Sequence, residues 1–107
     1  MTADMRNPMD VFQSEAPEVA RALGDLVDAL KNTGGLDEKT RHLIYIAMKA
    51  AAGDSAAVRH HVSMARQAGA ARAEVRDAIL LTLTDSGPRG VMRCLPGAMA
   101  AYDETAV

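Results

Sequence analysis

The chain has little of three residue types that restrict what it can do: one cysteine among 107 residues, no tryptophan, and three aromatic residues in all, two Tyr and one Phe. A lone cysteine excludes an intramolecular disulfide and fits a reducing compartment. No apolar run approaches the roughly 20 residues of a membrane span, and the start MTADMRNPMD lacks the apolar core of a signal peptide. We therefore expect a cytoplasmic protein with no membrane partner.

Charge and glycine spacing exclude two further classes. The formal net charge is -2 and the pI is about 5.8, so the sequence carries no electrostatic footprint for nucleic acid. Neither G-x-x-x-x-G-K nor G-x-G-x-x-G occurs, which removes support for a nucleotide-binding loop. We expect no nucleic-acid partner and no cofactor.

Helical periodicity dominates the residues that are present. The chain is 49% hydrophobic and lacks strand signals, which favours an all-α fold in one domain over residues 1–107. Pro17 suits the first turn of a helix that ends near Gly34 and Gly35, and a shorter turn is expected around Pro8 to Phe12. The apolar stripe of that helix is Val19, Leu23, Leu26, Val27 and Leu30.

Two more helices are expected in the middle of the chain. Asp37 is a good N-cap for the first, and Gly53 is a plausible stop. Asp54 or Ser55 can cap the second, which runs to Gly69. The sequence thus predicts a helical hairpin.

The histidines fall on this hairpin. His61 shares a face with Val58, Val62 and Ala65 and is expected to point inward, whereas His42 lies beside the apolar stripe of the first helix. His60 lies off the stripe, which indicates a solvated or interface residue.

The last third of the chain predicts two more helices. One, from about Ala73 to Asp85, is apolar on almost every side and is expected to be central. In the other, Pro96 must kink the helix or begin a new turn because it has no amide to donate. Such apolar helices need cover, which predicts a homo-oligomer.

Residues 36–70 also carry a motif. Leu36, Asp37, Lys39, Arg41, Leu43 and Ile44 follow the pattern L-D-x-K-x-R-x-L-I, and a histidine pair and a Gly-Ala helix end come later. This block resembles the carboxymuconolactone decarboxylase family, which includes the alkylhydroperoxidase D (AhpD) type peroxidases. The resemblance implies an AhpD-like helical bundle built on the hairpin, and a dimer, trimer or hexamer.

The departures from the family pattern fall on its chemistry. The relay glutamate of the family corresponds to His42, its two cysteines to Asp54 and Ala57, and its relay histidine to His61. The resemblance implies peroxidase (peroxiredoxin) activity through a C-x-x-C thiolate at a helix N-terminus. Asp54 and Ala57 can form neither a sulfenic acid nor a disulfide, so that cycle cannot run through these positions.

A different chemistry remains open if the packing of the family holds, because His42, Asp54 and His61 would then converge in one pocket. Imidazoles with a carboxylate can move protons near neutral pH, as decarboxylation or isomerisation of a small lactone or oxo acid requires. The decarboxylase branch of the family is similar in not depending on a cysteine pair.

Each candidate also has a purely structural interpretation. Asp54 can be only an N-cap, and His61 can be a hydrogen-bonded core residue. Cys94 is either a buried packing residue or, beside Arg93, the thiol of a one-cysteine peroxidase.

A metal-binding site is the other specific interpretation of the histidines. His60 and His61 are adjacent and point about 100° apart on a helix, whereas helical ligand pairs sit at i and i+4. Only His42, Asp54 and His61 could share an ion, and we expect no metal.

Two hypotheses follow for the function. The first is an enzyme that uses His61, with His42 and Asp54, for proton transfer on a small carbonyl or lactone substrate. The second is a non-catalytic oligomer that keeps the fold for small-ligand binding or as a scaffold. They differ in whether His42 and His61 can be reached from solvent.

Overall fold

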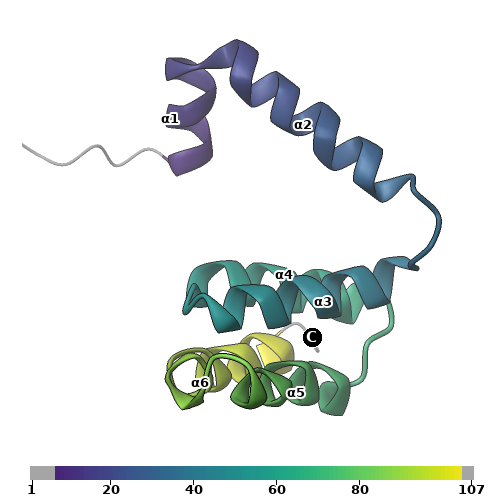
Figure 1. Ribbon diagram of the computed structural model, residues 1–107, viewed down its shortest axis with the longest axis vertical. Coiled ribbons are helices and arrows are strands. Elements are labelled where there is room, and N and C mark those ends of the chain that lie inside the picture. Colours follow the sequence, from purple (N-terminus) through teal and green to yellow (C-terminus); the bar gives the residue numbers. More distant parts are fainter. Residues whose placement is uncertain (1–6, 105–107) are drawn as a thin grey trace, which may run out of the picture. The chain divides into compact units, whose positions relative to one another are not determined.

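The computed structural model describes residues 7–104, all of whose regular elements are helices (Figure 1). This confirms the all-α prediction. The chain divides into two compact units, residues 1–35 and 36–107, which are described separately. No helix in the described part is both long and apolar enough to cross a membrane.

The first unit contains α1 (Pro8–Glu15) and α2 (Pro17–Lys31). The turn expected around Pro8 to Phe12 is thus a full helix, capped by Asn7, whose Oδ1 accepts a hydrogen bond from the Met9 amide at 2.8 Å. Pro17 occupies the first turn of α2, as predicted. The apolar stripe of α2 is exposed and comprises Val19, Leu23, Leu26, Val27 and Leu30.

The second unit contains α3 (Glu38–Ala51), α4 (Ser55–Gln67), α5 (Arg72–Leu80), the short 3₁₀ helix η1 (Leu81–Thr84) and α6 (Pro88–Glu104). The predicted hairpin is α3 and α4, which form one layer over a second layer of α5 and α6 (Figure 1). The core between the layers is made mostly of small and β-branched side chains, among them Ile46, Ala50, Val58, Val62, Val75, Ile79 and Ala98.

Two aspartates begin the hairpin helices. Asp37 Oδ1 accepts a hydrogen bond from the Thr40 amide at 2.7 Å, and Asp54 Oδ1 accepts one from the Ala57 amide at 3.1 Å. Both contacts satisfy an amide that has no partner inside its helix. The predicted N-caps are confirmed.

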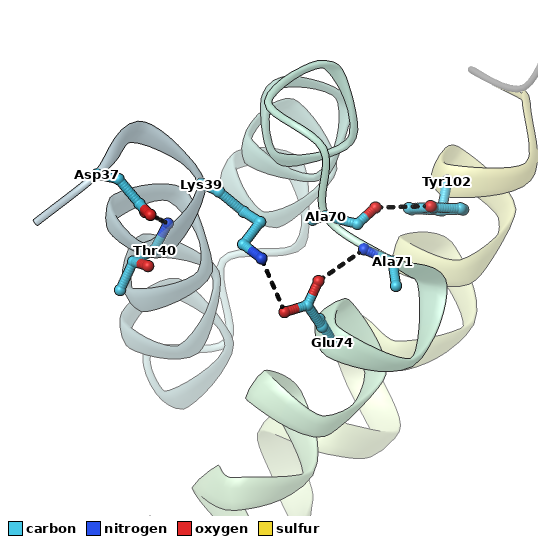
Figure 2. Close-up of polar contacts among 7 residues, drawn as sticks. All are labelled: Asp37, Lys39, Thr40, Ala70, Ala71, Glu74 and Tyr102. Atoms are coloured by element: carbon cyan, nitrogen blue, oxygen red, sulfur yellow. Dashed lines mark hydrogen bonds and ion pairs between the residues drawn. The ribbon is translucent and has the colours of Figure 1, made fainter.

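The α4–α5 connection is held by hydrogen bonds to the two residues just before α5 (Figure 2). Glu74 accepts a hydrogen bond from the Ala71 amide at 2.8 Å and pairs with Lys39 of α3 at 3.2 Å. The Tyr102 hydroxyl of α6 donates to the Ala70 carbonyl at 2.7 Å. These contacts join α3, α5 and α6 around one turn of chain.

The prediction of one central helix from about Ala73 to Asp85 is wrong in its second half. Helix α5 ends at Leu80 and continues as η1, in which Thr82 Oγ1 donates to the Ile79 carbonyl at 2.7 Å. Threonine hydroxyls bond nearby carbonyls and so favour such tightened turns. The tightening leaves Leu81 and Leu83 on the surface, 69% and 44% exposed.

Helices α3 and α6 approach very closely where Gly90 faces Ala50. A Cβ at Gly90 would collide with the Ala50 carbonyl oxygen, so the contact requires glycine. Helix α6 then runs through Pro96 without interruption, which shows that this proline does not begin a separate helix.

Candidate functional site

Four rings from the hairpin gather where α3 passes α4. Helix α3 supplies His42 and Tyr45, and α4 supplies His60 and His61. The Nδ1 atoms of His42 and His61 are 3.2 Å apart. The Tyr45 ring stacks on His61 with centroids 5.0 Å apart and planes at 16°, and His60 meets His61 edge-on at 5.4 Å. His61 is therefore the ring that contacts all the others.

The two central imidazoles differ in their access to solvent. His42 is buried, with 5% of its surface exposed, whereas His61 is half-buried and His60 is exposed. In a neutral imidazole one nitrogen donates and the other accepts. A hydrogen bond between two Nδ1 atoms therefore requires that one ring be protonated there and the other not.

Glu38 extends this pair toward the start of α3. Its Oε1 lies 4.0 Å from His42 Nε2, one turn away on the same helix. Glu38, His42 and His61 thus form a line from an exposed carboxylate, through a buried imidazole, to a half-buried one. A line of this kind can orient the tautomers and move a proton along it.

His61 is held in its neutral form. Burial, and after it the neighbouring charges of His42, His60 and Lys49, lower the pKa of His61 from 6.5 to about 4. At neutral pH the His61 ring can therefore accept a proton.

Asp54 has the structural role that the sequence allowed for it. It is the N-cap of α4, and its carboxylate bonds the Ala57 amide. Seven residues separate it from His61, which corresponds to about 10 Å along the helix axis. The structure thus brings His42 and His61 together and places Asp54 at the start of α4, the helix that carries His61.

Cys94 belongs to the core of the second unit. It is 1% exposed and packs in the cluster formed by the buried apolar residues. Burial raises the pKa of its thiol, an effect that Arg93 opposes and Asp54 reinforces. A protonated, enclosed thiol favours the packing interpretation over a nucleophile.

Over residues 7–104, no three His, Cys, Asp or Glu side chains lie close enough together to hold an ion.

Two residues of the site, Tyr45 in the ring cluster and Glu38 beside His42, were not predicted from the sequence. Tyr45 lies three residues after His42 and Glu38 lies four before it, so both share a face of α3 with that histidine. This i, i+3 and i, i-4 spacing is the signal that could have identified them.

Comparison with known proteins gives one match. A family model described as "Carboxymuconolactone decarboxylase family" matches residues 17–102. No curated protein and no solved structure matches the chain.

Proposed function

The chain belongs to the carboxymuconolactone decarboxylase family, and from this premise we propose that it catalyses histidine-based proton transfer on a small carbonyl or lactone substrate. The contact between His42 and His61 at 3.2 Å carries the proposal. It joins a half-buried ring that a substrate can reach to a buried ring that can orient it. The wild-type activity would be general acid–base catalysis.

His61 is the proposed proton acceptor. If its Nδ1–H donates to His42 Nδ1, its Nε2 carries the free lone pair and takes a proton from the carbon beside the substrate carbonyl. The electrons of that C–H bond form the enolate. In a β,γ-unsaturated substrate the negative charge is shared with the γ carbon, and return of the proton to that carbon completes an isomerisation. The lowered pKa of His61 keeps the ring neutral when the substrate binds and leaves Nε2 free, and it also makes the ring a weaker base than a free imidazole.

His42 and Glu38 are proposed as positioning residues. A buried His42 cannot contact a substrate from solvent, but its Nδ1 fixes the tautomer of His61. Glu38, 4.0 Å from His42 Nε2, would stabilise the positive charge that the pair acquires during the reaction.

Redox chemistry has weaker support. Asp54 and Ala57, at the positions of the family's cysteine pair, are joined by an N-cap hydrogen bond and neither side chain can be oxidised. The remaining thiol, Cys94, is in the core. We therefore do not propose peroxidase activity.

We further propose that the protein is a homo-oligomer. The exposed stripe of α2 and the exposed Ile44, Met48 and Leu81 in the second unit are large apolar side chains of the kind that subunits cover. Light scattering should give a mass at least twice the 11.3 kDa of the monomer, and a monomeric mass would contradict this proposal.

The enzymatic proposal is tested by proton exchange. Oxo acids and carboxylated lactones are incubated in D₂O with the wild type, and deuterium incorporation beside the carbonyl is followed by NMR. We expect exchange above background that His61→Gln lowers by about 100-fold or more, the scale of general acid–base catalysis. His60→Gln, which changes the neighbouring exposed ring, is the matched control and should retain the activity.

If no substrate in the panel exchanges, or if exchange survives in a folded His61→Gln protein, the proton-transfer proposal is wrong. The second hypothesis, a non-catalytic binding or scaffold protein, is favoured if ligands raise the thermal midpoint of the wild type without any turnover. Far-UV circular dichroism establishes that each variant is folded.

A further inference from the structure

A hollow of about 310 Å³ lies on the second unit, away from the ring cluster. One wall is the end of α3 and the turn after it, and the other is the start of α6. The lining residues are Ala51, Ala52, Gly53, Ser86, Arg89, Gly90 and Arg93. His42 lies nine residues before Ala51, about 13 Å along the axis of α3, so this hollow is separate from the contact between His42 and His61.

The charge of the hollow is positive. Arg89 and Arg93 are one turn apart on α6 and therefore share a face of that helix. Both are exposed, and within residues 7–104 no carboxylate forms an ion pair with either of them. By contrast, Arg72 and Arg76, on α5, are each paired with an aspartate. Two guanidinium groups that face one cavity without a partner are a recognition element for an oxyanion.

The surrounding backbone keeps the hollow open. Gly90 lets α6 pack against the Ala50 carbonyl, which brings the first turns of α6 beside the end of α3. Gly53 has a φ of +75°, and the site of its absent Cβ lies 3.5 Å from Cδ of Arg93. The stem of Arg93 thus lies beside the backbone of this turn.

The acidic residues next to the lining in the sequence, Asp54 and Asp85, form no ion pair with Arg89 or Arg93 in the described part of the chain. Asp54 follows Gly53, but its carboxylate caps α4 through the Ala57 amide. Asp85 precedes Ser86 and borders a different hollow, with Met48 and Leu81. The amides at the start of α6, a helix of 17 residues, add the positive end of a helix dipole beside the two arginines.

We propose that this hollow binds a small oxyanion of the carboxylate or phosphate type, gripped by Arg89 and Arg93. Its volume lies at the lower end of the range for small-molecule sites, which fits a compact acid of a few carbon atoms or inorganic phosphate and not a nucleotide. The inference goes beyond the proposed catalysis, because the site involves neither His42 nor His61.

The test is anion binding to the full chain at constant ionic strength. Succinate, inorganic phosphate and chloride are titrated against the wild type, with binding followed by calorimetry and by amide chemical shifts. We expect succinate or phosphate, but not chloride, to bind and to shift the amides of Gly53 and Gly90. Tighter binding of succinate would identify a carboxylate site, and tighter binding of phosphate would identify a phosphate site.

Variants make the test specific. Arg89→Gln and Arg93→Gln should each weaken binding tenfold or more. Arg59→Gln removes the same charge from α4, outside the lining of the hollow, and should leave binding within twofold. His61→Gln should bind like the wild type, which separates this site from the proposed catalysis. Equal binding of chloride, shifts spread over the surface, or unchanged affinity in Arg93→Gln would overturn the proposal.

Discussion

His42 and His61 face each other through their Nδ1 atoms at 3.2 Å, so the contact can hold one proton but not two. If both rings were protonated, each would present an N–H to the other and two positive charges would be in contact. The native hairpin therefore favours the neutral form of His61, which makes the protein sensitive to acid.

The stability of the wild type is expected to fall as the pH is lowered from about 6.5 to 4. The pKa of His61 is 6.5 in the unfolded chain and about 4 in the folded one, so in this window the unfolded state binds more protons. Stability therefore rises with pH across the window, by on the order of 1–3 kcal/mol from this residue. Thermal midpoints measured at half-unit pH steps would show the slope.

Two variants assign that slope to one residue. His61→Gln has no titrating ring and should flatten the midpoint between pH 4.5 and 6.5, whereas His60→Gln should keep the slope. The same steepness in the wild type and in His61→Gln would show that other groups cause the acid sensitivity.

Asp54→Ala is expected to destabilise the protein by about 1 kcal/mol, because the Ala57 amide loses its acceptor. Asp54→Ser should recover most of the loss, since serine is also a good N-cap. Urea unfolding of the three proteins measures the effect. If alanine and serine give the same stability as the wild type, the capping role assigned to Asp54 is incorrect.

Gly90→Ala should destabilise the second unit strongly, because its methyl group would meet the Ala50 carbonyl. Gly97→Ala is the matched control on the same helix, since a Cβ there would be 3.5 Å from the flexible Arg59 guanidinium. Alanine is favoured over glycine in a helix by up to about 1 kcal/mol, so Gly97→Ala should be neutral or stabilising. Similar melting curves for the two variants would contradict the close approach of α3 and α6.

The Cys94 thiol should be alkylated slowly in the native protein. It is 1% exposed and its pKa is raised by burial, so little thiolate is available at pH 7.5. Iodoacetamide modification, followed by mass spectrometry, should be at least tenfold slower without urea than in denaturing urea. A rapid reaction of the folded protein would revive the one-cysteine peroxidase interpretation.

Local rules recovered much of the fold. The caps at Asp37 and Asp54 could be predicted because an N-cap depends on a side chain and an amide three residues later. The inward orientation of His61 followed from helical periodicity in the same way. The 3₁₀ helix η1 could not be predicted from local rules. Leu81 and Leu83 continue the apolar pattern of α5, whereas Thr82 and Thr84 favour the change to a 3₁₀ helix.

The parts of the site that could not be predicted depend on contacts between distant segments. Tyr45 stacks on His61 only because α3 and α4 cross at that point. Arg89 and Arg93 line a hollow only because glycine at position 90 lets α6 reach α3. Helical spacing places Tyr45 on the face of His42 and Arg89 on the face of Arg93, but it does not show which distant segment each face contacts.

The stacking of Tyr45 on His61 gives the molecule a built-in optical reporter. With two tyrosines and no tryptophan, the near-ultraviolet emission of the protein comes from tyrosine alone. One emitter touches the ring proposed to accept the proton, at 5.0 Å between centroids, while the other, Tyr102, lies beneath the Arg66 guanidinium on the α6 side. Changes in the charge of His61 can thus be followed by light in the unlabelled protein, with Tyr102→Phe leaving a single emitter.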